Sequence, residues 1–213
     1  MGAAGSIDAP AQLAAVTRTV VFSNEEGQSR YSVILSQDHP LAARDLWPAL
    51  SDAGRLAQWF AVVGGDLRAG GTYAIANNAT GTIERCQAPL GFSVSWEYEG
   101  ELSRVGVRLD AREDATTLRL EHVCDIDGEV YPEYGPGAIG IGWDLALLGL
   151  AQHLFQGASV PPETTGWIKD PAALEFMEGS SRAWADASIA AGSEEHHARM
   201  AQERCTTAYV GIG

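Results

Sequence analysis

The segment 137–155, GAIGIGWDLALLGLAQHLF, most strongly limits what this chain can fold into. Apolar side chains at helical spacing cover one face of the segment and much of another, and Asp144 is its only charged side chain before Leu150. The first face holds Ile139, Trp143, Ala146, Leu147, Leu150 and Leu154. A helix that is apolar nearly all round must be covered on more than one side, so we expect a helix buried in the core.

A membrane span is the alternative for such a segment. At 1.5 Å per residue the helix is about 28 Å long, which is somewhat short for a span. It also carries the polar side chains of Asp144, Gln152 and His153. A buried core helix is therefore the favoured interpretation.

Strand-like segments come before this helix. Two strands are expected at 17–23 and 31–37, joined by the polar turn 24–28. Helical spacing follows at 40–50, and Ser51 is expected to cap a second short helix directly after it. Two short helices therefore interrupt the strands.

Six further strands are predicted, each bounded by Gly, Pro, Asn or Asp. They are 65–68, 71–77, 81–86, 91–98, 104–111 and 116–123. The short connections between them favour an antiparallel meander.

Apolar and polar residues alternate along the last three of these strands, so one face of the sheet should be apolar and the other solvated. The apolar face comprises Phe92, Val94, Trp96, Tyr98, Val105, Val107, Leu109, Leu118, Leu120 and His122. The solvated face comprises Ser93, Ser95, Glu97, Arg104, Arg108, Arg119 and Glu121. A curved sheet with one apolar face, followed by a long apolar helix, predicts an α+β fold in which the helix lies across the concave face.

The rest of the chain flanks this main domain, which is expected at 17–156. Residues 1–16 are expected to form a flexible N-terminus, because the first dozen or so lack periodicity. The extension at 157–213 holds a helix opened by Asp170 and a last helix capped by Ser193. Because this extension is too small to hold its own core, we expect it to pack on the outer side of the long helix.

The net charge of −14 would repel phosphate backbones and anionic lipids, so neither nucleic acid nor an acidic membrane is an expected partner. A single lysine against thirteen arginines, with many alanines and glycines, is typical of GC-biased bacterial coding. Cys86, Cys124 and Cys205 lack the paired spacing of zinc ligands, and no secretory segment precedes them. Free thiols in a reducing cytoplasm are expected.

Two apparent motifs are not expected to hold a cofactor or a metal. Residues 135–140 match G-x-G-x-x-G, but neither a buried strand nor a βαβ alternation surrounds them. These glycines should instead let loop and sheet backbones approach the start of the long helix. The run Glu194, Glu195, His196 and His197 offers too few ligands for a metal site.

A series of short motifs occurs in the order of a known family. They are 45–60 (DLWPALSDAGRLAQWF), 64–71 (GGDLRAGG), 81–84 (GTIE) with Pro89, 94–98 (VSWEY), 120–122 (LEH) and 142–143 (GW). With these motifs the chain resembles START-like (SRPBCC) proteins of the branch named after the activator of heat-shock-protein ATPase. The region 184–209 is similar to an extension on some bacterial members.

The resemblance implies a helix-grip fold, in which an antiparallel sheet wraps around a long C-terminal helix and leaves a cavity between them. The superfamily includes lipid and hormone binders, polyketide cyclases and oxygenase domains, so the fold does not choose the function. The branch name implies a co-chaperone, although the eukaryotic activator also has an N-terminal domain that this chain lacks.

His122 and Asp144 are the candidate catalytic residues. His122 falls on the inward-facing positions of its strand, where it could orient a ligand or act as a base. The alternative is a core histidine that is hydrogen-bonded to backbone or to a helix residue such as Asp144. For Asp144 itself, a structural role near the start of the long helix is favoured over a catalytic one.

Seven residues are predicted to line a ligand cavity between the sheet and the long helix, or else to fill that space by packing. They are Trp59, Tyr73, Trp96, Tyr98, His122, Trp143 and Leu147. Aromatic side chains of this kind are typical both of apolar pockets and of cores.

Three functions remain open at this point. The first is non-catalytic binding of a small hydrophobic or aromatic molecule in the cavity. The second is regulation of a chaperone or another protein partner, and a homodimer could form through a sheet edge or the C-terminal helices. The third is a cyclase-like or hydrolytic enzyme that uses His122.

Overall fold

The computed structural model describes residues 8–25, 27–126 and 130–211, and its contacts divide the chain into two compact units. The sheet unit comprises the described parts of Val21–Ala57 and Ala61–Gly128. The helical unit comprises the described parts of Met1–Val20, Gln58–Phe60 and Glu129–Gly213. The long apolar helix thus shares a unit with the C-terminal helices, whereas the predicted domain and extension separated them.

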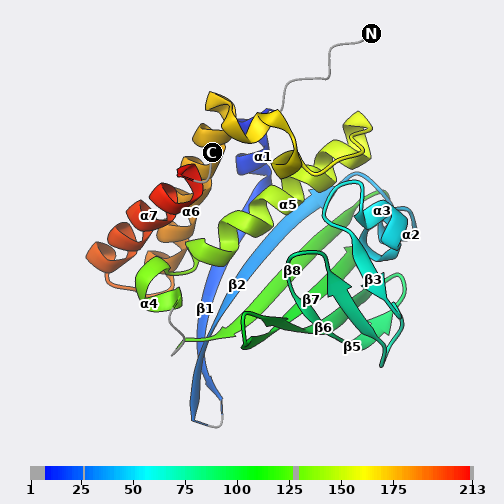
Figure 1. Cartoon of the computed structure of the whole chain (residues 1–213), viewed down its shortest axis with the longest axis horizontal. Coiled ribbons are helices and arrows are strands. Elements are labelled where there is room, and N and C mark those ends of the chain that lie inside the picture. Colours follow the sequence, from blue (N-terminus) through cyan, green and yellow to red (C-terminus); the bar gives the residue numbers. More distant parts are fainter. Residues whose placement is uncertain (1–7, 26, 127–129, 212–213) are drawn as a thin grey trace. The chain divides into compact units, whose positions relative to one another are not determined.

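Eight strands form one antiparallel sheet within the described residues (Figure 1). They are β1 (Val16–Glu25), β2 (Gln28–His39), β3 (Val63–Gly65), β4 (Thr72–Ile75), β5 (Thr80–Gln87), β6 (Gly91–Tyr98), β7 (Glu101–Ala111) and β8 (Thr116–Asp125). Their order across the sheet is β1-β2-β8-β7-β6-β5-β4-β3. The predicted meander is confirmed for β3 to β8, and β2 lies beside β8.

The first strand of the meander differs from its prediction. The strand expected at 65–68 is β3, Val63–Gly65, and a turn follows it. Gly71 closes this turn by donating its N–H to the Arg68 carbonyl. A Cβ at Gly71 would lie 2.0 Å from the Asp66 carbonyl oxygen, so the backbone can only turn this tightly at a glycine.

Two short helices, α2 (Ala43–Ser51) and α3 (Ala53–Leu56), interrupt the strands as predicted. The predicted cap at Ser51 is wrong, because Ser51 is still helical and its hydroxyl donates to the Trp47 carbonyl. Asp52 has an extended backbone, and its carboxylate accepts the Arg55 N–H. A carboxylate in that position caps the second helix.

Strand register confirms the predicted alternation of the sheet. Val105 pairs with His122, Val107 with Leu120 and Leu109 with Leu118, so these side chains share one face. The same face continues onto β6, where Val94 pairs with Val105. Tyr98 differs from the prediction, because it ends its strand and is 44% exposed.

The helical unit holds the remaining helices of the described chain (Figure 1). They are α1 (Ala9–Ala15), α4 (Val130–Tyr134), α5 (Gly137–Gln156), the 3₁₀ turns η1 (Pro162–Thr164) and η2 (Gly166–Lys169), α6 (Pro171–Ala190) and α7 (Glu195–Val210). The long helix α5 confirms the segment predicted at 137–155. Of the predicted flexible N-terminus, residues 1–7 lie outside the described residues, and α1 was not predicted.

Two glycines of the G-x-G-x-x-G run let other helices approach α5. A Cβ at Gly140 would lie 2.2 Å from the Trp184 ring of α6, and a Cβ at Gly137 would lie 3.0 Å from Cys205 Sγ of α7. The prediction that loop and sheet backbones approach these glycines is therefore wrong, because the groups that approach them are side chains of α6 and α7. Side chains of the C-terminal helices occupy the space that a Cβ would need.

The N-cap of the last helix lies one residue later than predicted. Glu194, not Ser193, is the N-cap of α7, and its carboxylate accepts the N–H groups of His196 and His197. The Ser193 hydroxyl instead shares a hydrogen bond of 2.7 Å with the Ser188 hydroxyl of α6. This bond holds the turn between the two antiparallel helices.

Among the described residues, α5 is the single helix long and apolar enough to cross a membrane by length and composition. In the structure, 56% of its apolar window is buried. A core helix of a folded domain meets the same criterion, so this finding is weak evidence for a membrane span.

We predict that Gly140→Ala destabilises the protein by about 1–3 kcal/mol, because its methyl group overlaps the fully buried Trp184 ring. Gly142→Ala in the same helix is the control. Its Cβ meets only the Tyr209 hydroxyl at 3.5 Å, an ordinary contact, and alanine favours the helix by about 0.5–1 kcal/mol. Urea denaturation measures both, and equal losses of stability would contradict the close approach of α5 and α6.

Candidate functional site

The buried face of the sheet becomes polar at one end. Tyr31 of β2 pairs with Cys124 of β8, and Trp96 of β6 pairs with Ser103 of β7. His122 lies two residues from Cys124 on β8, between Val33 of β2 and Val105 of β7, and therefore on the same face. We call Tyr31, Cys124, Ser103, Trp96 and His122 the polar row.

His122 is the centre of the polar row. Its side chain is almost fully buried, and its Nε2 lies 2.8 Å from the Ser103 hydroxyl oxygen. The Trp96 ring lies beside it, with a centroid distance of 5.7 Å. Burial lowers the pKa of His122 from 6.5 to about 4, because the charged imidazolium would lose its hydration. The imidazole is therefore neutral at physiological pH, with one nitrogen that donates and one that accepts.

Cys124 supplies a thiol but not a nucleophile. Burial raises its pKa to about 12, and hydrogen bonds with Tyr31 and Ser103 oppose this shift only in part. Because the thiolate is the reactive form of cysteine, this side chain is unreactive at neutral pH. Its protonated thiol is a weak hydrogen-bonding group within the row.

Taken together, these groups can hold the polar end of an otherwise apolar molecule. Hydroxyl, imidazole and phenol groups offer hydrogen bonds, while Val33, Val105 and the Trp96 ring offer apolar contact. Buried polar groups lower stability unless they are hydrogen-bonded, and Ser103 and His122 meet that condition through each other. Perturbed titratable groups in buried positions are enriched at functional sites.

The other residues predicted to bind a ligand fall in different places. In the sheet unit, Tyr73 is buried, and its hydroxyl donates to the Ser95 carbonyl at 2.8 Å. Burial raises its pKa to about 12, so it stays a neutral donor. Tyr98 is exposed at the end of β6, away from the buried positions of the strand.

Trp59, Trp143 and Leu147 belong to the helical unit. Phe60 stacks on the Trp143 ring at a centroid distance of 6.0 Å and also contacts the neighbouring Trp59 ring. Gly149 of α5 makes room for this segment, because a Cβ there would lie 2.5 Å from the Trp59 carbonyl oxygen. Leu147 is buried. A role of these residues in ligand binding stays a prediction.

Asp144, the second catalytic candidate, is held by other side chains of the helical unit. Arg18 of β1 donates from Nε and Nη2 to its two carboxylate oxygens, each at 2.9 Å. Ser180 and Trp184 of α6 donate to Oδ2 at 2.5 and 3.0 Å. The Asp144 side chain has no exposed surface. These four donated hydrogen bonds favour the structural role that the sequence predicted for Asp144.

Sequence reasoning missed Ser103, Cys124 and Tyr31. The signal was present, because Ser103 and Cys124 continue the alternation that carries Val105 and His122. It was lost because one predicted strand began at residue 104 and the other ended at residue 123. Ser103 and Cys124 therefore each lay one residue outside a predicted strand. Within the described residues, no group of three or more His, Cys, Asp or Glu side chains could hold a metal ion.

A family model matches residues 40–154, more than half of the chain. It describes the Activator of Hsp90 ATPase homolog 1-like proteins. The chain belongs to this family. The matched residues include every member of the polar row except Tyr31, and they include α5 as far as Leu154. None of the curated proteins with which the chain was compared matches it.

Solved structures agree with this assignment. CalU16 from Micromonospora echinospora is 29% identical in its crystal structure, which covers 82% of this chain and 99% of that chain with a TM-score of 0.67. Its solution structure is 28% identical, covers 84% of this chain and 97% of that chain, and has a TM-score of 0.70. EF2215 from Enterococcus faecalis is 14% identical over 82% of this chain and 92% of that chain, and it shares the fold with a TM-score of 0.58.

The fold class predicted from the sequence is thereby confirmed. This member of the Hsp90 ATPase activator family has the α+β helix-grip fold of START-like proteins. The match with CalU16 covers more of the chain than the family model does, so the similarity extends beyond residues 40–154. The family's fold is one that binds ligands, which is consistent with a binding role.

We predict that His122 makes stability depend on pH. Its pKa is about 4 in the folded state and 6.5 in the unfolded state, so between these values the unfolded state binds more protons. Stability should therefore fall as the pH drops below 6.5, by about 2 kcal/mol from this histidine between pH 7 and pH 5. His122→Gln should remove that part of the loss, whereas His196→Gln, at an exposed position, should not. Urea denaturation at both pH values measures the free energy of unfolding. An identical change in this energy with pH for the two variants would contradict the buried neutral imidazole.

We predict that Asp144→Asn costs about 3–5 kcal/mol of stability, because it leaves the buried Arg18 cation without a counter-charge. Asp125→Asn is the matched control. Asp125 is 54% exposed in its ion pair with Arg30, so its loss should cost less than about 1 kcal/mol. Chemical denaturation separates the two cases. A loss of less than about 1 kcal/mol for Asp144→Asn would show that the ion pair between Arg18 and Asp144 does not hold α5 in place.

Proposed function

We propose that this protein binds a small hydrophobic or aromatic molecule whose polar end reaches the polar row. The observation that carries the proposal is the hydrogen bond between the half-buried Ser103 and the buried His122, beside the Trp96 ring. A neutral imidazole can both donate and accept, so it suits an uncharged polar group such as a hydroxyl or a carbonyl. The apolar residues around it suit the rest of such a molecule.

Family membership supports binding in general but does not choose the ligand. The three cysteines, Cys86, Cys124 and Cys205, are all free thiols. Because thiols persist in a reducing compartment, we place this binding activity in the cytoplasm. A charge of −14 makes an uncharged ligand more suitable than a polyanion.

We predict that 2-naphthol, an aromatic molecule with one hydroxyl, binds the protein with one saturable site. Ser103→Ala removes the hydroxyl beside His122 and should weaken binding about tenfold, the value of one good hydrogen bond. Ser95→Ala is the control, because the Ser95 hydroxyl accepts the Thr82 N–H and belongs to the other face of β6. Isothermal titration calorimetry measures all three affinities.

A native mass spectrum of freshly purified protein provides an independent test. A discrete excess mass that disappears on denaturation would support a retained small molecule and would indicate its class. A clean mass together with no heat from 2-naphthol would contradict the proposal. Equal affinities of the two serine variants would contradict the role of the polar row.

Catalysis is a second candidate, and the distance of 2.8 Å between Ser103 Oγ and His122 Nε2 favours it. At that distance the neutral imidazole could accept the hydroxyl proton. Its low pKa makes it a weak base, so binding remains the function that the geometry supports better. With any substrate that is identified, unchanged turnover in Ser103→Ala would exclude this pair as catalytic groups.

A further inference from the structure

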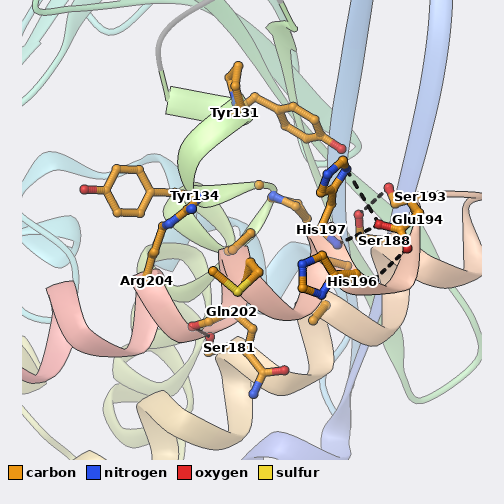
Figure 2. Close-up of a pocket in the computed structure, with 18 residues that line it drawn as sticks. Tyr131, Tyr134, Ser181, Ser188, Ser193, Glu194, His196, His197, Gln202 and Arg204 are labelled. Atoms are coloured by element: carbon orange, nitrogen blue, oxygen red, sulfur yellow. Dashed lines mark hydrogen bonds and ion pairs between the residues drawn. The ribbon is translucent and has the colours of Figure 1, made fainter.

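The helical unit contains a pocket of about 530 Å³ that none of the sequence motifs predicted. It is lined by α4, the start of α5, α6 and the part of α7 from His196 to Arg204 (Figure 2). Its volume lies within the range of pockets that bind small molecules, roughly 300–1,000 Å³. All of its lining residues belong to the helical unit, so it is separate from the polar row of the sheet.

The apolar and aromatic lining of the pocket suits a ring system. Three alanines provide a surface without long side chains: Ala185 of α6, and Ala198 and Ala201 of α7. Tyr131 and Tyr134 of α4 add aromatic rings, and Met200 adds a thioether. Aromatic rings and thioether sulfur both make favourable contacts with a bound aromatic group.

The pocket contains a guanidinium, which only donates, alongside groups that both donate and accept hydrogen bonds. Arg204 of α7 donates from Nη1 to the Glu133 carbonyl at 3.1 Å, which holds the guanidinium at the pocket wall (Figure 2). The imidazoles of His196 and His197 also line the pocket. A guanidinium carries five N–H groups, so most of its donors remain for another partner.

The one carboxylate among the pocket's described lining residues is already engaged. Glu194 accepts the N–H groups of His196 and His197 at 3.2 and 3.0 Å. These bonds lower the pKa of Glu194, because they stabilise the charged carboxylate. Glu194 thus stays charged and is engaged at the start of α7, and the exposed Arg204 is the cation that the lining offers to a ligand.

We propose that this pocket binds an aromatic carboxylate, with the ring against the Tyr131 side of the pocket and the carboxylate on Arg204. A planar guanidinium matches a carboxylate in geometry and charge. The site does not depend on the ligand of the polar row, because the two differ in unit and in the charge that they favour. At physiological salt, screening over about 8 Å limits repulsion from the acidic remainder of the chain.

We predict that the full-length protein binds 2-naphthoate in this pocket and binds the uncharged 2-naphthamide at least about tenfold more weakly. Arg204→Gln should weaken naphthoate binding about tenfold, while Arg204→Lys, which keeps the charge, should retain part of it. Arg182→Gln is the matched control, since Arg182 is exposed on α6 and does not line the pocket. Calorimetry gives the affinities, and circular dichroism checks that each variant is folded.

Backbone amide NMR of the labelled protein locates the bound molecule. The proposal expects shifts at Gly135, Gly137 and Ala198, around the pocket. Shifts confined to the strands near His122 would overturn it while supporting the proposed function of the polar row. Absence of binding by 2-naphthoate, indole-3-acetate and biphenyl-4-carboxylate would also overturn it, as would equal affinities of Arg204→Gln and Arg182→Gln.

Discussion

One buried carboxylate organises the helical unit. Asp144 accepts hydrogen bonds from Arg18, Ser180 and Trp184, and Arg18 also donates to the Leu13 and Val16 carbonyls. A buried charge is tolerated only when it is paired and hydrogen-bonded, so these segments must assemble together. The segment from Leu13 to Arg18 is thus held against α5 and α6. The C-terminal helices lie against Gly137 and Gly140 of α5. The pocket beside α4 and α7 depends on that arrangement.

The sheet unit follows a different constraint, the alternation of side chains along paired strands. Antiparallel register places every second residue of β6, β7 and β8 on one face, and that face is mostly apolar. The departure from this pattern is local, at Ser103, His122 and Cys124. Hydrogen bonds among these groups make their burial tolerable, and a titratable group with a shifted pKa in such a position is a candidate for function.

Much of the candidate site in the sheet could be predicted, and the pocket could not. Strand alternation placed Trp96 and His122 on the buried face, because period-two patterns survive in the sequence. Ser103 followed the same pattern but lay beyond the predicted end of its strand. The pocket joins Tyr131 of α4, a helix that the sequence did not predict, to Met200 and Arg204 of the predicted last helix. No local pattern states which helix faces which.

By itself, the sequence determined the class of fold, the meander, the long helix and the family motifs, because these depend on local periodicity and on residues that are close along the chain. Tertiary structure alone decided the partners: Trp184 against Gly140, Arg18 on Asp144, and Ser103 on His122. Each of these contacts joins residues that are at least nineteen positions apart. Such contacts depend on how whole elements pack, so periodicity can indicate that a side chain is buried but not what it meets.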